Sequence, residues 1–305
     1  MGIFLGIDGG GSKTSCIVGD ENSVLGTGTS AGSNMVRVGE RHARASLSAA
    51  IRQACAAANT TPAQIERTCV GIAGGALPEI AEVVHGLLSE LVSGEVVVVG
   101  DMVIAMEAAF GSGPGVIVIS GTGSIAYGRN SAGQTARAGG WGFAISDEGS
   151  GHWIGRSAVA ACMRAYDEMG VESGGVLLES IMKFWGVSTR ERVVVVANGS
   201  PPPDFAALLP AVASVSDAGD ATARSILTQA GVELATLGKI VIGRIFDNAG
   251  MVPVAVSGGV FRNCALVREV FYDRVRDWYP QVLPNASLVD PARGALELAR
   301  KGIYS

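Results

Sequence analysis

The stretch Phe4–Thr14 reads FLGIDGGGSKT, a short apolar strand that runs into three glycines beside Asp8. A turn without Cβ atoms lets backbone N–H groups close around an anion. The spacing nearly matches a P-loop, but Ser12 displaces the lysine by one place. A P-loop also needs a helix after the turn, whereas Ser15–Val18 has the pattern of a strand. We therefore predict a β-hairpin whose turn binds an anion, with an ordinary tight hairpin as the alternative.

A second glycine-rich turn follows another apolar strand. Val116–Ser120 reads VIVIS and leads into Gly121–Ser124, which reads GTGS. The dinucleotide fingerprint fits these glycines, but it must open a helix and be followed by an acid about 20 residues later. Residues 125–128 look like a strand, and no acid occurs between Gly121 and Ser146. A dinucleotide site is therefore disfavoured, and two similar turns indicate a nucleotide-dependent phosphotransferase that holds a triphosphate between two similar domains.

The chain is long enough, at 305 residues, for about two domains. The glycine-rich stretch Gly111–Gly115 is the best boundary, and a similar order of elements returns after it, which suggests a weak internal duplication. We expect an α/β fold with a first domain over residues 1–113 and a larger second domain over residues 114–291. A helical insertion is expected at about 150–248, and a last helix at about 292–305 is expected to pack back on the first domain.

Hydrophobic periodicity predicts the order βββαβαβα in the first domain. Its strands are expected at 3–7, 15–19, 24–28, 68–73 and 96–99, and its helices at 40–58, 78–92 and 101–110. In the second domain, strands are expected at 116–120, 124–129, 134–138 and 252–257. A helix is expected from about 149, and residues 176–248 should be almost entirely helical except near 199–203.

Composition limits the classes of partner. Apolar residues make up 48% of the chain, which is enough for a sizeable core, and the net charge of −5 argues against nucleic acid or an anionic membrane. No signal-peptide pattern and no apolar run of about 18 to 20 residues is evident, so we expect a cytoplasmic protein. The five cysteines lack metal or disulfide spacing and are expected to be buried thiols; they are Cys16, Cys55, Cys69, Cys162 and Cys264.

Several polar residues lie at predicted strand ends or turns. Asp101 follows four valines and a glycine, so we expect it at the end of a central strand, placed as a general base, with an N-cap role as the alternative. Asp147 could bind ligand hydroxyls or cap the next helix. Asn34 could bind ligand hydroxyls through its amide or form an Asx turn. Trp141, among three glycines, suggests backbone close to something flat and polar, or only a flexible loop. The three histidines lie far apart and are expected at the surface or as caps: His42, His85 and His152.

Together these motifs carry a resemblance. DGGGS at residues 8–12, SGTGS at 120–124, GGWG-x4-DEGS at 139–150 and SGG at 257–259 follow one another as in a known family. The chain resembles, along nearly its whole length, N-acetylglucosamine kinases of the BadF-type ATPase family. This family belongs to the superfamily of acetate and sugar kinases, heat-shock chaperones and actin.

The resemblance implies two ribonuclease-H-like, actin-like ATPase domains with an interdomain cleft that closes over ATP and an amino sugar, in a homodimer. Asp101 would be the base that takes the proton from the sugar 6-hydroxyl, and Asp8 would hold Mg²⁺, through water. The sugar would be bound by Asn34, Asp101, Thr122, Gly140 and Asp147. The nucleotide would be bound by Gly9, Gly10, Gly11, Ser12, Gly121, Thr122, Gly123, Gly258 and Gly259.

Two departures leave the sugar open. Ala73 replaces a serine of the animal-type enzymes, and Ile125 stands where some members carry a polar residue, so N-acetylglucosamine, glucosamine and N-acetylmuramic acid are all candidates. The same family contains ATPase activators with an iron–sulfur cluster, but no cysteine lies between Cys69 and Cys162, where its ligands are expected. A nucleotide-switched binding protein is the other alternative, although it has no need for Asp101 and Asp147 together.

Overall fold

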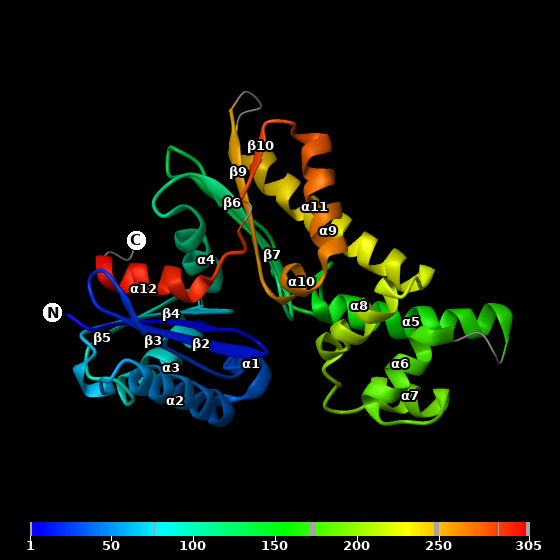
Figure 1. Ribbon diagram of the computed structural model, residues 1–305, viewed down its shortest axis with the longest axis horizontal. Coiled ribbons are helices and arrows are strands. Elements are labelled where there is room, and N and C mark those ends of the chain that lie inside the picture. Colours follow the sequence, from blue (N-terminus) through cyan, green and yellow to red (C-terminus); the bar gives the residue numbers. More distant parts are fainter. Residues whose placement is uncertain (1, 76, 171–174, 247–249, 286, 303–305) are drawn as a thin grey trace. The chain divides into compact units, whose positions relative to one another are not determined.

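The computed structural model describes residues 2–75, 77–170, 175–246, 250–285 and 287–302. The chain divides into two compact units. The first unit comprises the chain up to Ile117, then Arg129–Gly133, and the chain from Val289 onward. The second unit comprises Val118–Gly128 and Gln134–Leu288. Each unit is built around one five-stranded sheet (Figure 1).

The first crossing between the units falls inside a strand, four residues after the expected boundary at residue 113. Arg129 Nη2 donates hydrogen bonds to the carbonyl oxygens of Gly111, at 2.6 Å, and Gly113, at 3.0 Å. These bonds tie the glycine-rich stretch to a later segment of the first unit. Strand β6 (Gly115–Ser120) then runs on without a break, so the chain changes units within it.

The sheet of the first unit is mixed. Its strands are β1 (Phe4–Gly9), β2 (Lys13–Gly19), β3 (Val24–Ala31), β4 (Arg67–Ile72) and β5 (Glu95–Gly100), in the order β3-β2-β1-β4-β5. The pairs β1–β2 and β2–β3 are antiparallel, whereas the pairs β1–β4 and β4–β5 are parallel. Because β2 follows the first glycine turn with no helix between them, the predicted hairpin is confirmed and the P-loop is excluded.

Helices cover both faces of this sheet. They are α1 (Met35–Val38), α2 (Glu40–Ala57), α3 (Pro78–Ser89), α4 (Asp101–Phe110) and α12 (Pro291–Lys301), with a 3₁₀ turn η1 at Pro62–Gln64. Figure 1 shows α2 and α3 on one face and α4 and α12 on the other, and each pair shares a buried apolar cluster with the sheet. The predicted order βββαβαβα is confirmed.

The alternation along β1 explains this layering. Leu5 and Ile7 are fully buried in the cluster with α2 and α3, whereas Phe4 joins the cluster with α4 and α12. At Gly6, a Cβ atom would overlap the backbone of Leu296 in α12. A glycine at this position therefore allows the last helix of the chain to pack directly against the central strand.

The second sheet repeats the topology of the first. Its strands are β6, β7 (Ser124–Arg129), β8 (Thr135–Gly139), β9 (Val252–Ser257) and β10 (Val282–Pro284), in the order β10-β9-β6-β7-β8. Counted along the chain, both sheets have the order third, second, first, fourth, fifth. The predicted internal duplication is therefore confirmed, and so is the strand after the second glycine turn that argued against a dinucleotide fingerprint.

The second unit also carries the helical insertion. Its helices are α5 (Gly151–Met169), α6 (Gly175–Trp185), α7 (Arg190–Ala197), α8 (Leu209–Asp217) and α9 (Ala221–Ile245), with a 3₁₀ turn η2 at Phe205–Leu208. The predicted break near 199–203 is confirmed, while the predicted helix at 247–248 lies outside the described residues. The structure adds α10 (Gly259–Asn263), α11 (Ala265–Trp278) and β10, which the sequence analysis did not predict.

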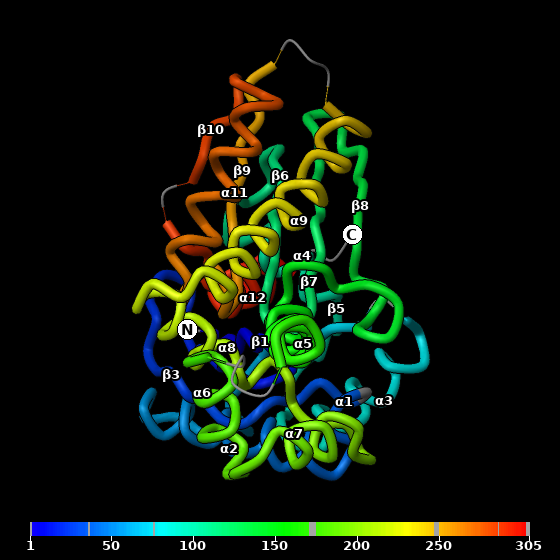
Figure 2. The backbone as a smooth tube through the Cα atoms, turned by 90° about the vertical axis from the view of Figure 1, so that its right-hand side faces the viewer, coloured from blue at the N-terminus to red at the C-terminus, as the bar shows by residue number. Residues whose placement is uncertain are grey.

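Helix α9 corrects the expectation that no apolar run is long enough to cross a membrane. By length and composition it is long enough, with a mean hydropathy of 1.3 over 18 residues. Half of that window is buried, and α9 packs against α5, β8 and α11. Figure 2 shows α9 running beside α11. The apolar length of α9 is therefore accounted for by core packing in the second unit.

Candidate functional site

The first glycine turn is tied to the segment that carries Asn34. The turn is closed by a hydrogen bond of 3.0 Å from Gly10 N–H to the carbonyl of Lys13. The carbonyl of Gly10 then accepts hydrogen bonds from the N–H groups of Ser33, at 3.1 Å, and Asn34, at 3.3 Å. The structure thus brings Asn34 against the predicted phosphate-binding turn, although the two are about 24 residues apart in the chain.

A buried pair of hydroxyl groups, which the sequence analysis missed, supports this arrangement. Thr14 Oγ1 lies 2.7 Å from the carbonyl oxygen of Ala31 and 2.8 Å from Ser33 Oγ, and both hydroxyl side chains are fully buried. A Cβ at Gly9 would lie 3.0 Å from Ser33 Oγ. The absence of a side chain at Gly9 therefore allows the Ser33 segment to pack closely, whether or not a ligand binds at this turn. A polar pair of small residues 19 apart gives no periodic signal in a sequence.

The strand register places Asp8 and Asp101 at the same end of the parallel strands of the first sheet. Gly9 is aligned with Ile72 of β4, and Ile72 with Gly100 of β5, so these three parallel strands end together. Asp8 is the penultimate residue of β1, and Asp101 directly follows β5. The prediction that Asp101 ends a central strand is wrong, because β5 is an edge strand. Its valines are explained by α3 and α4, which cover β5 on both faces.

Asp101 is the first residue of α4, and Gly100 occupies the N-cap position. The alternative of an N-cap aspartate is therefore wrong. Asp101 Oδ1 accepts a hydrogen bond of 2.9 Å from the N–H of Met102. Burial raises the pKa of the Asp101 carboxyl above its usual range, and the Met102 bond opposes that shift only in part. A carboxylate with a raised pKa is a better proton acceptor than an ordinary aspartate.

The second glycine turn is held by its neighbours in the second unit. Gly121 donates its N–H to the carbonyl of Gly123 at 2.9 Å, and the carbonyl of Gly121 accepts the N–H of Gly151 at 2.8 Å. A Cβ on Gly121 would meet only open space, so this position is accessible to a ligand. Gly258 has a φ of 101°, and a Cβ there would overlap the carbonyl of Ser120. The predicted adenosine turn therefore abuts the predicted phosphate turn.

Asp147 is held in a strained conformation beside this turn. Its φ is 73°, which is uncommon for a residue other than glycine and costs about 1–3 kcal/mol unless its surroundings enforce it. Asp147 is only 7% exposed, and its Oδ1 accepts a bond of 3.3 Å from Ser124 N–H. Burial raises the pKa of Asp147, the Ser124 bond lowers it, and the charge of Glu148 raises it further.

Two buried serines bind the turn that contains Asp147 and Glu148 to the second glycine turn. Ser120 Oγ donates to the carbonyl of Gly149 at 2.9 Å, and Ser124 Oγ donates to that of Glu148 at 2.8 Å. Gly140 N–H donates to the carbonyl of Ser124 at 2.9 Å. The structure thus joins the predicted phosphate turn, Gly140 and Asp147 in one hydrogen-bonded network. The two serines were quoted in the motifs, but their role was not predicted.

Replacing Ser120 by alanine is expected to lower the free energy of unfolding by about 1–3 kcal/mol, because the buried carbonyl of Gly149 loses its donor. Ser188, which is exposed in the same unit, supplies the matched control. Ser188→Ala should change stability by less than about 0.5 kcal/mol. Urea denaturation of the two variants measures both values, and equal stabilities would contradict the clamp.

The loop between β8 and α5 presents aromatic side chains. The guanidinium of Arg137 stacks on Trp141 at 4.1 Å from the ring centroid, so the flat polar group near this tryptophan is a side chain. His152, which was expected at the surface or as a cap, also takes part in an aromatic cluster. Its half-buried ring lies 5.0 Å from that of Phe143 and 5.3 Å from that of Phe205, measured between centroids. His42 and His85 are exposed, as expected.

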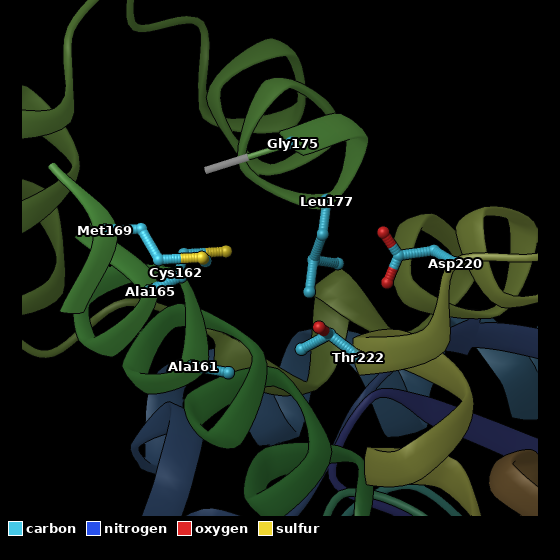
Figure 3. A pocket seen from close by; sticks show the side chains of 8 residues that line it. All are labelled: Ala161, Cys162, Ala165, Met169, Gly175, Leu177, Asp220 and Thr222. Carbon is cyan, nitrogen blue, oxygen red and sulfur yellow. The ribbon is translucent and has the colours of Figure 1, made fainter. Parts of the chain in front are cut away.

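None of the five cysteines is among the predicted site residues. All five are buried free thiols, which confirms the prediction. Figure 3 shows Cys162 of α5 across a pocket of about 120 Å³ from Asp220, which precedes α9. Burial and then the charge of Asp220 raise the pKa of Cys162 to about 12, so this thiol stays protonated. None of the predicted site residues lines this pocket.

The duplicated α/β sheets, each with a glycine turn after its first strand, define a two-domain ATPase of the predicted ribonuclease-H-like class. Residues 5–299 match the BadF/BadG/BcrA/BcrD ATPase family, and the chain belongs to this family. A solved structure from Chromobacterium violaceum has a TM-score of 0.76 at 23% identity, covering 98% of this chain and 99% of that one. This similarity supports the fold, and the predicted fold class is confirmed.

The chain is similar in sequence to two kinases that act on amino sugars according to their names. The chain is 31% identical over 304 residues to the N-acetylmuramic acid/N-acetylglucosamine kinase of Clostridium acetobutylicum, which covers 98% of this chain and 99% of the relative. It is 29% identical over 316 residues to the N-acetyl-D-glucosamine kinase of Dictyostelium discoideum, with 97% of each chain covered. Both similarities extend over nearly the whole length of the chain.

Proposed function

We propose that this chain is an ATP-dependent amino-sugar kinase that phosphorylates the 6-hydroxyl of N-acetylglucosamine, with N-acetylmuramic acid as a second candidate substrate. The observation that carries the proposal is the place of Asp101. Asp101 is a half-buried carboxylate with a raised pKa. It lies at the end of the first sheet where β1, the strand before the first glycine turn, also ends. The names of the relatives supply the class of substrate.

In the proposed reaction, Asp101 accepts the proton of the sugar 6-hydroxyl as that oxygen attacks the γ-phosphorus of ATP. The new O–P bond forms while the bond to the β,γ-bridging oxygen breaks, and ADP leaves. Phosphoryl transfer depends mainly on positioning and on neutralising charge. The sugar would be positioned by four further residues: Asn34, Thr122, Gly140 and Asp147.

The backbone of the two glycine turns would hold the phosphates. Gly10 and Gly121 already donate their N–H groups within their own turns, so the remaining N–H groups of Gly9–Ser12 and Gly121–Gly123 are the ones proposed to face the phosphates. Gly258 and Gly259 would contact the adenosine. Support comes from the open space beside Gly121 and from the packing of Gly258 on Ser120.

The residues fit a magnesium ion that arrives with the phosphates. Mg²⁺ usually keeps several waters and binds one or two carboxylates together with substrate phosphates. Asp8 is a half-buried carboxylate directly before the glycine turn, and within the described ranges no group of three or more His, Cys, Asp or Glu side chains could cage a metal. When bound, Mg²⁺ would neutralise charge on the phosphates.

The position of phosphorylation tests the regiochemistry. We expect the product of N-acetylglucosamine and ATP to carry phosphate on O6, seen as a coupling between the ³¹P signal and the two H6 protons. The anomeric proton should keep the shifts and mutarotation of a free reducing sugar. A ³¹P coupling to H1 instead would contradict the proposed role of the 6-hydroxyl while leaving an amino-sugar kinase in place.

Replacing Asp147 by asparagine should raise the KM for the sugar by about 10–100-fold, because a charge-assisted hydrogen bond to a sugar hydroxyl is lost. Asparagine tolerates the left-handed backbone at this position, so the fold should survive. Glu148→Gln is the matched control, since it removes the neighbouring charge without touching the proposed sugar ligand. Steady-state kinetics in which both variants show the same KM would remove Asp147 from the sugar site.

The proposal includes a homodimer, as the resemblance implies, and a cytoplasmic location, as expected from the sequence. Light scattering after size-exclusion chromatography measures the mass of the particle in solution. A mass of one chain of 31.1 kDa would contradict the dimer without affecting the proposed reaction.

A further inference from the structure

A groove of about 890 Å³ lies in the second unit, between α11 and the segment that follows β10. Figure 1 shows α11 and β10 in orange at the top of the view. Sites for small molecules typically measure about 300–1,000 Å³. None of the residues proposed to bind sugar, phosphate or adenosine lines the groove. It is therefore large enough for a separate metabolite.

One face of α11 supplies the floor of the groove. Arg268, Tyr272 and Arg276 recur every four residues and all line it. The adjacent face of α11 carries buried apolar side chains, including Phe271 and Val275, which anchor the helix in the core. The polar face is thus presented by a helix that the core holds in place.

Arg268 of α11 is tied to α10, the helix that carries Arg262. Arg268 Nη1 donates a hydrogen bond of 2.6 Å to the carbonyl of Phe261, which immediately precedes Arg262 in α10. Arg262 also lines the groove and is exposed. Because a guanidinium carries five N–H donors, the bond to Phe261 orients Arg268 and leaves further donors for a ligand.

Another part of the groove combines a ring and a third guanidinium. The hydroxyl of Tyr272 donates to the carbonyl of Asn285 at 3.2 Å, which fixes the ring against the far wall. Arg276 lies 5.8 Å from the centroid of this ring and 3.5 Å from a carboxylate oxygen of Asp273. This part offers a flat ring and a charge that is already partly balanced.

The charge of the groove opposes that of the chain. The groove is lined by three arginines and by two carboxylates, Glu269 and Asp273, whereas the whole chain carries a net charge of −5. Guanidinium groups keep their charge at any physiological pH, and their planar fork matches the oxygens of a phosphate. An excess of arginine in an acidic protein therefore favours an anion at this place.

We propose that this groove binds a small phosphorylated metabolite, with its phosphate between Arg262 and Arg268 and the rest of the molecule along Tyr272 and Arg276. Arg268 and Arg276 stand eight residues apart in α11, about 12 Å along the helix axis, so the groove extends well beyond the size of one phosphate. It therefore has room for a phosphate ester with a body of its own. This site does not depend on the proposed kinase reaction.

Calorimetric titration at constant ionic strength tests the site, with inorganic phosphate, N-acetylglucosamine 6-phosphate and AMP as probes. The titrations are run without Mg²⁺ and with ADP and N-acetylglucosamine present, so that the proposed catalytic site is occupied. Arg262→Gln and Arg276→Gln should each weaken binding of the phosphate esters by about tenfold. Arg274→Gln removes the same charge from α11 but does not line the groove, and it should change affinity by less than about twofold.

The probes also separate the two sources of phosphate. Tighter binding of the sugar phosphate than of AMP would identify a phosphorylated sugar, and the reverse order a nucleotide. Equal losses in all three arginine variants would mean that only the general charge of the surface is sensed, and unchanged affinity in Arg262→Gln and Arg276→Gln would exclude the groove. Either result overturns the proposal. Unchanged sugar-dependent ADP release by Arg276→Gln would show that the site and the kinase reaction are separate.

Discussion

Asp101→Asn is expected to lower kcat by about 10²–10⁴-fold and to leave the affinity for ATP nearly unchanged. The substitution removes the proton acceptor, but an amide oxygen can still accept the hydrogen bond from Met102. Steady-state kinetics with an amino sugar, together with a nucleotide-binding titration, measures both effects. An unchanged kcat would remove Asp101 from its assignment as the base.

The raised pKa of Asp101 adds a pH signature. A base works only when deprotonated, so activity should fall as the pH drops through the pKa of Asp101. Because burial raises that pKa, the acidic limb of kcat/KM should lie above the value of about 3.9 for an ordinary aspartate. The Asn variant should retain no such limb in its residual activity. A limb that persists unchanged would belong to another group.

The burial of Asp101 also predicts that Asp101→Asn makes the protein more stable at neutral pH although it makes it less active. A carboxyl whose folded pKa is raised favours the folded state below its unfolded pKa, and this contribution is lost as the pH rises through the folded value. At neutral pH the buried charge of Asp101 therefore destabilises the protein, and Asp101→Asn should raise Tm. Below the ordinary aspartate pKa the difference should vanish. A lower Tm at neutral pH would contradict the burial argument.

Gly294→Ala should cause the largest loss of stability in the first unit. Gly294 lies in α12, and a Cβ there would overlap the carbonyl oxygen of Ile104 and lie 2.7 Å from the N–H nitrogen of Ala108, both in α4. Since both neighbours are backbone atoms within a helix, they cannot move aside without separating α12 from α4. We expect unfolding to become easier by about 1–3 kcal/mol or more.

Gly86→Ala is the matched control for this prediction. Gly86 lies in α3, is exposed, and a Cβ there would meet nothing within 4 Å. The same substitution should therefore stabilise the protein by about 0.5–1 kcal/mol, because alanine is the better helix former. Chemical denaturation of both variants gives the comparison. Similar stabilities would mean that α12 does not pack on α4 as described.

The elements with strong local signals could be predicted from the sequence. Each glycine turn stands between two apolar strands, so the two hairpins, and with them the duplication, follow from local pattern. Helix α11 was missed although Val267, Phe271 and Val275 recur every four residues, because arginines and acids between them lower its apolar content. Strand β10 has only three residues, too few for any periodicity.

The candidate site was predictable only in its residue types. The edge position of β5 could not be read from four valines, because helices on both faces demand apolar residues at an edge as well as at the centre. The clamp of Ser120 and Ser124 on the Asp147 turn depends on contacts between segments more than 20 residues apart. The strained backbone of Asp147 is likewise enforced by those contacts.

A coupled assay of ADP release with Mg·ATP tests the central claim most directly. The panel would hold N-acetylglucosamine, N-acetylmuramic acid, glucosamine and glucose, with a reaction lacking sugar as the control. We expect rapid ADP release that depends on an N-acetylated amino sugar and that Asp101→Asn lowers by at least about 100-fold. Slow ADP release at the same rate with every sugar and with none would contradict the account and indicate a nucleotide-switched protein instead.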